Sequence, residues 1–99
     1  MKIPIPLIET LVWDDWNLEH IQKHDVTPGE VEEVVEPTAH YVTSYKNRVM
    51  VTGQTLNGRF LTVVIGESPD LVAHWYVFSA RPASRKERVR YEEAGRDEG

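Results

Sequence analysis

The sequence of 99 residues contains no cysteine, which excludes disulfide bonds and thiolate metal sites. Long apolar runs are missing as well. Runs such as WYVF at 75–78 are only a few residues long, too short to cross a membrane. The first ten residues, MKIPIPLIET, lack the apolar core and cleavage site of a signal peptide. These absences predict a cytoplasmic protein that does not associate with membranes.

Positive charges are the minority, with 11 Lys and Arg against 16 Asp and Glu, and the net charge is −5. The positive charges are also unevenly distributed along the chain. Five of the 11 Lys and Arg residues fall between Arg81 and Arg90, opposed there only by Glu87. This segment has a local charge of +4, which leaves −9 for the rest of the chain. A chain polarised in this way can present a positive patch to a phosphate or to an acidic partner.

The length corresponds to one domain, which we place at residues 1–94, followed by a polar tail at 95–99 that we expect to be disordered. Two helices are predicted in the first half. WDDWNLEHIQKH at 13–24 can be capped by Asp14 or Asp15. The second helix starts at a proline directly after Thr27, which forms a capping box with Glu30.

The second half alternates with a period of two and predicts strands. Together with an early strand at 7–13, strands are expected at 39–45, 48–56, 59–65 and 71–80. Asn57-Gly58 predicts a two-residue hairpin turn with positive φ at both positions. Ser84 and Glu87 form a capping box that opens a final helix running to about Ala94. We therefore expect an α+β fold of order β-α-α-β-β-β-β-α. A small antiparallel sheet would have the two N-terminal helices on one side, with a C-terminal helix after it.

The basic segment is poorly explained by core packing, because Val89 is its only aliphatic side chain between residues 83 and 94. Arg81 ends the last strand and Arg59 begins its expected neighbour. An antiparallel pairing would therefore bring the two guanidinium groups together. Two planar donor groups at one sheet end would suit a phosphodiester. The alternative is a solvated helix face whose charges pair with neighbouring glutamates.

Three segments carry a resemblance to a known family: VWDDWNLEHIQKHDVTPGEVEEVV, RVMVTGQTLNGRFLTVVI and FSARPASRKERVRYEE. The matching positions are Trp13-Asp14, Asn17, Lys23-His24, Arg48, Gly53, Gly58-Arg59, Ser79-Ala80-Arg81, Arg85, Glu87-Arg88 and Tyr91. In this pattern the chain resembles the BrnT family of bacterial toxins, and residues 1–94 would form one BrnT-like domain.

The resemblance implies a RelE-like fold and a ribonuclease that inhibits translation without a metal ion or other cofactor. It also implies an antitoxin partner of the BrnA type, which covers the active surface and binds operator DNA. A homodimer is a further assembly that these expectations leave open. Such a nuclease must orient the phosphate, neutralise the developing charge and move protons.

Phosphate binding and transition-state stabilisation are assigned to Arg59, Arg81 and Arg88, with Arg81 central. Three further basic residues complete the expected substrate-binding set: Arg48, Arg85 and Lys86. These assignments follow the positions shared with the family pattern and the charge of the basic segment.

Tyr91 and His24 are the candidates for proton transfer, and each has a structural alternative. Tyr91 would donate to the leaving oxygen, or it would pack the last helix onto the sheet. His24 would act as acid or base, or it would complement the dipole at a helix C-terminus. His20 and His24 are four residues apart, but without a third ligand they do not predict a metal site.

The acidic balance, with a pI of about 5.3, keeps a second hypothesis open. In it the chain is an inactive or repurposed relative that binds a protein or RNA through its C-terminal arginine cluster. Five aromatic residues could stack on bases: Trp13, Trp16, Trp75, Tyr76 and Phe78. They lie within apolar runs, which favours core positions for most of them.

Overall fold

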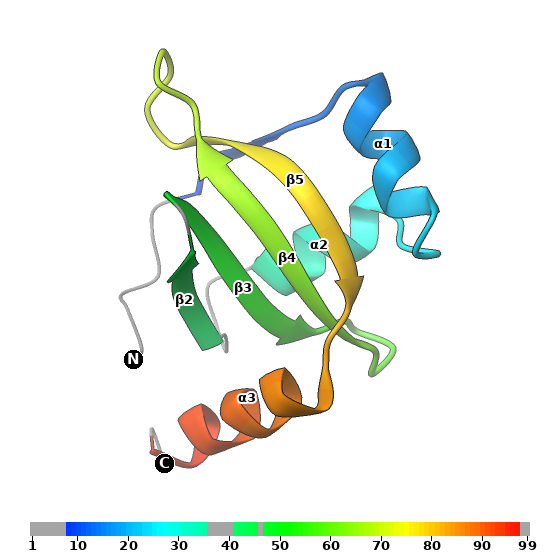
Figure 1. Cartoon of the computed structure of the whole chain (residues 1–99), viewed down its shortest axis with the longest axis vertical. Helices are drawn as coiled ribbons and strands as arrows, with labels where there is room; N and C mark the ends of the chain where they lie inside the picture. The colour runs from blue at the N-terminus through cyan, green and yellow to red at the C-terminus, as the bar shows by residue number, and fades with distance from the viewer. Residues whose placement is uncertain (1–7, 36–40, 46, 98–99) are drawn as a thin grey trace.

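The structure is a computed structural model that describes residues 8–35, 41–45 and 47–97. It has a small α+β fold with one mixed sheet and three helices, so the predicted fold class is confirmed (Figure 1). The elements are β1 (Thr10–Val12), α1 (Asp15–Gln22), α2 (Pro28–Val35), β2 (Tyr41–Tyr45), β3 (Arg48–Gln54), β4 (Phe60–Glu67), β5 (His74–Pro82) and α3 (Arg85–Asp97).

The sheet has the strand order β1-β5-β4-β3-β2. Strands β2 to β5 form an antiparallel meander, but β1 pairs with β5 in parallel, with Leu11 opposite Trp75. The expectation of a wholly antiparallel sheet is therefore wrong at this edge. The chain passes through α1 and α2 before it re-enters the sheet, and so long a connection allows either strand direction.

The hairpin between β3 and β4 differs from the predicted two-residue turn. Gly58 donates its N–H to the carbonyl of Thr55 at 2.9 Å, and the N–H of Thr55 donates to the carbonyl of Arg59 at 2.8 Å. Gly58 has φ +91, whereas Asn57 is not among the described residues with positive φ. The connection is a three-residue loop that needs glycine only at its last position.

Hydrogen bonds of Asp14 and Asn17 fix the start of the first helix. Asp14 is the N-cap of α1, and its side chain and that of Asn17 each accept the other's backbone N–H at 2.9 Å. Asn17 is completely buried, and its amide donates to the carbonyl of Val12 at 2.9 Å. Asp14 and Asn17, two of the positions that carry the resemblance, therefore have a structural role in joining β1 to α1.

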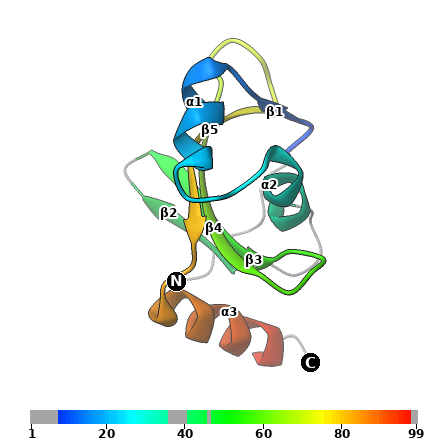
Figure 2. The same ribbon diagram turned by 90° about the vertical axis from the view of Figure 1, so that its right-hand side faces the viewer.

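The core lies between α2 and the sheet. Val31 and Val34 of α2 are fully buried against Leu61 and Val63 of β4, and Ile21 of α1 joins them. Figure 2 shows α2 along one face of the sheet. β1 pairs only with the first part of β5, from His74 to Tyr76, and α1 packs against β5 as well.

The last helix packs against β2 and β3, at the end of the sheet away from α1 (Figure 1). Its side chains are largely exposed, and Val89 is 46% exposed, so apolar burial holds it only weakly. It continues to Asp97, three residues into the segment predicted to be a tail. Residues 98–99 lie outside the described part of the chain. Among the described helices, none has the length and apolar character to span a bilayer.

Candidate functional site

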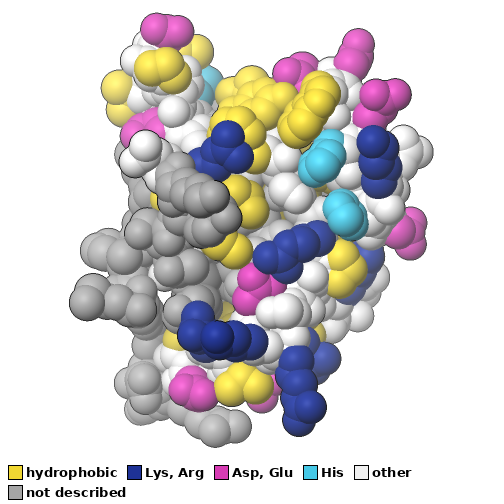
Figure 3. Space-filling model, viewed as in Figure 1, with side chains coloured by type: hydrophobic (Ala, Val, Ile, Leu, Met, Phe, Trp, Pro, Cys, Tyr) yellow, Lys and Arg dark blue, Asp and Glu magenta, His cyan; other side chains and the backbone are white. Residues whose placement is uncertain are grey.

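The sheet face opposite the core is the candidate site, and we call it the open face. It carries Thr62 and Val64 of β4 and their partners Arg81 and Ser79 of β5, because side chains alternate between the two faces of a strand. Figure 3 looks onto this face and shows hydrophobic, histidine and Lys or Arg side chains gathered over the strands and the neighbouring helices.

A β-bulge in β5 adds an aromatic ring to the open face. Val64 pairs with Ser79 and Ile65 pairs with Val77, so Phe78 is an extra residue on β5. The ring of Phe78 lies so close to Gly66 that a Cβ there would be 2.7 Å from its Cε2 atom. Glycine at position 66 therefore allows the ring to lie against the strand.

Helix α1 and the turn after it contribute a row of three rings. The rings of Trp16 and His20 are stacked, with centroids 4.8 Å apart and an interplanar angle of 9°. The rings of His20 and His24 meet edge to face, with centroids 6.0 Å apart. The spacing of four residues places Trp16 and His20 on one side of α1, and His24 lies in the turn that follows the helix. The sequence analysis noted the spacing of His20 and His24 but considered the pair only as a metal site, and it expected Trp16 in the core.

Arg81 forms a salt bridge with Glu87 through two hydrogen bonds on the open face. Its Nη1 and Nη2 atoms donate to the two carboxylate oxygens of Glu87 at 2.8 and 2.9 Å. The hydroxyl of Thr62 and the backbone N–H of Ser84 donate to Oε1 of the same carboxylate. Hydrogen bonding from Arg81 is the largest cause that lowers the pKa of Glu87 to about 2, and the same bond raises the pKa of Arg81.

Arg59 does not join Arg81, and the predicted convergence of these two guanidinium groups is wrong. Arg59 donates to the Glu30 carboxylate on α2 at 3.2 Å and to the backbone carbonyls of Asp25 and His24. Its side chain therefore lies on the core side of the sheet, where it ties the end of α1 to the start of α2. The physical reason is strand parity, since Arg81 pairs with Thr62 and Arg59 is three residues earlier.

Two other predicted arginines lie over aromatic rings. The guanidinium carbon of Arg48 is 3.6 Å from the ring centroid of Phe78, and that of Arg88 is 4.4 Å from the centroid of Phe60. Tyr91 packs edge to face on Phe60, with ring centroids 5.7 Å apart, which is the packing alternative considered for this residue. Arg85 and Lys86 are exposed on the first turn of α3.

A groove of about 700 Å³ runs between α1 and the strands of the open face. Its lining consists of Trp16, His20, Arg48, Val64, Tyr76, Phe78 and Ser79. The hydroxyl of Tyr76 donates to the carboxylate of Asp14 at 2.9 Å. Partial burial, and then the contact with this carboxylate, raise the pKa of Tyr76, so its hydroxyl remains a hydrogen-bond donor.

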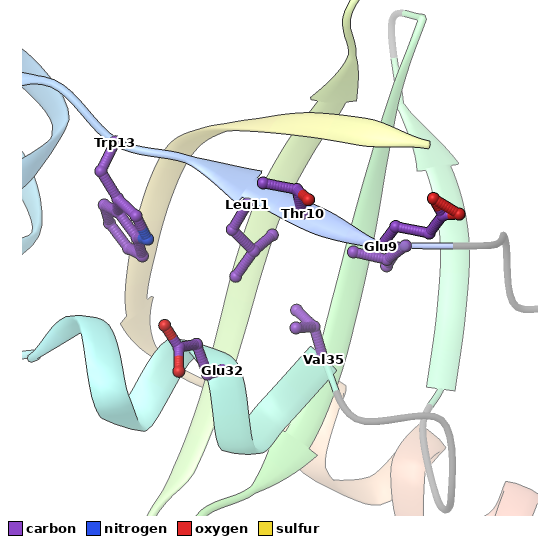
Figure 4. A pocket seen from close by; sticks show the side chains of 7 residues that line it. Glu9, Thr10, Leu11, Trp13, Glu32 and Val35 are labelled. Atoms are coloured by element: carbon purple, nitrogen blue, oxygen red, sulfur yellow. The ribbon is translucent and has the colours of Figure 1, made fainter. Parts of the chain in front are cut away.

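A second cavity, of about 440 Å³, lies on the other side of the sheet between β1 and α2 (Figure 4). Trp13 and Leu11 point toward α2, and Glu32 points from α2 toward them. Its other charged lining residue is Glu9, so carboxylates supply the charge in this cavity. It is therefore poorly suited to a phosphate, in contrast to the groove on the open face.

Among the described residues there is no group of three or more His, Cys, Asp or Glu side chains placed to hold a metal ion. Comparison with known proteins gives no further guidance: no family model matches the chain, and no curated protein matches it.

Proposed function

We propose that this chain is a ribonuclease that cleaves RNA without a metal ion. The observation that carries the proposal is the composition of the open face. His20 and His24 lie on the side of α1 that borders a sheet surface carrying Arg48 and Arg81, with Glu87 paired to Arg81 and Arg88 added from α3, although the chain as a whole is acidic. Histidine exchanges a proton near neutral pH, and arginine binds phosphate oxygens.

The reaction would be an internal transfer at one phosphodiester. The 2′-hydroxyl attacks the phosphorus, one imidazole takes the hydroxyl proton, and the other gives a proton to the departing 5′-oxygen. The products are a 2′,3′-cyclic phosphate and a 5′-hydroxyl. His20 and His24 take the two proton-transfer roles, in an order that the chemistry leaves open.

Arg81 would stabilise the charge that develops on the phosphate oxygens. A guanidinium has five N–H donors, and the contacts of Arg81 with Glu87 and the carbonyl of Pro82 use three of them. The pair with Glu87 therefore orients the group and leaves two donors for a ligand. Arg88 would supply a further contact from α3.

The proposal is tested with purified protein and single-stranded RNA in excess chelator. We expect cleavage that yields cyclic phosphate ends, and no cleavage of 2′-O-methyl RNA, because the attacking hydroxyl is then blocked. His20→Ala and His24→Ala should each lower the rate by about 10²-fold or more. Leu18→Ala, which changes an exposed side chain of the same helix, is the control. Equal rates in all four proteins would overturn the assignment.

We further propose that the nuclease acts as the toxin of a toxin–antitoxin pair, in a RelE-like fold. The support is the resemblance of its three sequence segments to the BrnT family, together with an open face that an antitoxin of the BrnA type would cover. Expression of the chain alone should stop bacterial growth, and co-expression of the partner should restore it. Continued growth at high levels of soluble parent protein would contradict this role.

The second candidate function is a binding module without turnover. Arg85, Lys86 and Arg90 are all exposed on α3 and could dock an acidic partner or RNA. The same assay separates the two functions, because a binding module would retain RNA and leave it intact.

A further inference from the structure

The groove on the open face is bounded by two sets of flat surfaces. On the α1 side, Trp16 is 55% exposed and its ring is backed by the parallel ring of His20. On the sheet side, the guanidinium of Arg48 lies over the ring of Phe78, which itself lies against Gly66. The groove of about 700 Å³ is lined by the side chains of Trp16, His20, Arg48 and Phe78.

The floor of the groove is held in place by contacts within the protein. Tyr76 meets Phe78 edge to face, with ring centroids 4.9 Å apart, and its hydroxyl is bound to both carboxylate oxygens of Asp14. Because Asp14 also caps α1, one residue connects the helix wall to the strand wall. The surfaces are therefore arranged before any ligand arrives, which lowers the entropic cost of binding.

We propose that this groove is a subsite for one unstacked base of single-stranded RNA. The inference rests on the proposed RNA-directed function and names what the groove recognises. A nucleobase is planar and stacks on aromatic rings and on guanidinium planes, whatever its sequence. Arg48 supplies both a stacking plane and a positive charge for the adjoining phosphate. The volume falls within the range of about 300–1,000 Å³ that is usual for small-ligand sites.

Charge also favours RNA over an apolar peptide as the occupant. Arg48 and His20 line the groove, whereas carboxylates line the cavity on the opposite side of the sheet. An adjoining depression of about 550 Å³ shares Arg48, Tyr76 and Phe78 and includes Glu67. The Glu67 carboxylate accepts a hydrogen bond from the N–H of Ala73 at 3.1 Å, which partly satisfies this negative group within the protein.

Binding can be separated from cleavage with 2′-O-methyl RNA, which lacks the attacking hydroxyl. The probes are two short labelled oligonucleotides of equal length, one with all its bases and one abasic, and fluorescence anisotropy gives the Kd. We expect the oligonucleotide with bases to bind the parent at least about tenfold more tightly than the abasic one. Trp16→Ala should remove most of this difference and leave the affinity for the abasic probe unchanged.

Two further variants make the test specific. Gly66→Ala would displace the Phe78 ring without removing a groove side chain, and it should also reduce the preference for bases. Leu18→Ala removes an exposed apolar side chain of α1 that does not line the groove, and it should have no effect.

The outcomes distinguish this inference from the proposed function. Binding that depends on bases and on Trp16 supports the subsite even if native RNA is not cleaved, and that result would overturn the nuclease alone. Cleavage of native RNA with equal affinity for both probes would overturn the subsite alone. Failure of the parent to bind either probe would overturn the subsite and would favour a protein occupant.

Discussion

Two arginine–glutamate pairs, one on each side of the sheet, are built on the same local motif. Glu30 and Glu87 are each the last residue of a capping box, and each carboxylate reaches back to the N–H of its N-cap. Each then binds an arginine: Arg59, which directly precedes β4, in one case, and Arg81 of β5 in the other. The same motif thus joins a helix to the sheet twice.

The two arginines differ in which parts of the chain their other contacts join. Arg59 also donates to the backbone carbonyls of His24 and Asp25, so it is bound to the protein on several sides. Arg81 donates to Glu87 and to the backbone carbonyl of Pro82, its neighbour in the sequence, so its contacts stay on the open face. The comparison teaches that an arginine with a salt-bridge partner can be either a structural tie or an oriented ligand group, and that the other contacts decide which.

The largest expected effect is the loss of RNA cleavage when Arg81, but not Arg59, is replaced. Arg81→Ala should lower the rate of RNA cleavage by about 10²-fold or more, because it removes a donor to the transition state. The measurement is the single-turnover rate on single-stranded RNA, with circular dichroism to verify the fold. A rate within twofold of the parent would place Arg81 with Arg59 as a structural residue.

The converse experiment is Arg59→Ala. It should lower the free energy of unfolding by about 1–3 kcal/mol, because charged hydrogen bonds to Glu30 and to two carbonyls are lost. The rate of cleavage per folded molecule should stay unchanged. Urea denaturation measures the first quantity and the single-turnover assay the second. A stable Arg59→Ala protein with a lower rate would reverse our assignment.

The pH dependence of stability sharpens the comparison. The pKa of Glu87 is lowered from 4.5 to about 2 in the folded protein, so its contribution is present above its unfolded pKa. That contribution is lost as the pH falls from about 4.5 to 2, and it should amount to about 1–2 kcal/mol after solvent screening. Urea unfolding at about pH 5 and about pH 3 should show about half of this loss in the parent, because pH 3 is still above the folded pKa. The loss should be smaller in Glu87→Gln, and identical losses in both proteins would exclude Glu87 as its source.

The smallest expected effect concerns the exposed charges of α3. Lys86→Ala should weaken binding of 2′-O-methyl RNA by a few-fold and lower the salt dependence of log Kd by about one phosphate contact. Glu92→Ala, on the same exposed helix, is the matched control and should not weaken binding. An unchanged salt dependence after Lys86→Ala would remove this residue from the RNA contact.

Local features were predictable because they depend on neighbours in the sequence. The capping boxes of Thr27 with Glu30 and of Ser84 with Glu87 were both predicted, and both are confirmed. Asp14 was named as a possible cap and is one. In each case two residues three apart satisfy the free N–H groups of a helix start.

The candidate site was only partly predictable. Arg48, Arg88 and His24 lie where a phosphate-binding surface is proposed, but Trp16, Tyr76 and Phe78 were expected mostly in the core. Phe78 faces outward because β5 contains a bulge, which its sequence does not mark. Trp16 is exposed because α1 packs against β5 and turns its other side, with Ile21, into the core.

By itself, the sequence determined where most elements begin, how the charge is distributed and which residues cap the helices, because these depend on short-range chemistry and periodicity. The tertiary structure alone decided that β1 is parallel, that Arg59 and Arg81 face opposite sides, and that a groove forms beside Trp16. The physical reason is that strand register and packing assign each side chain to a face, and one bulge or a shift of one residue reverses that assignment.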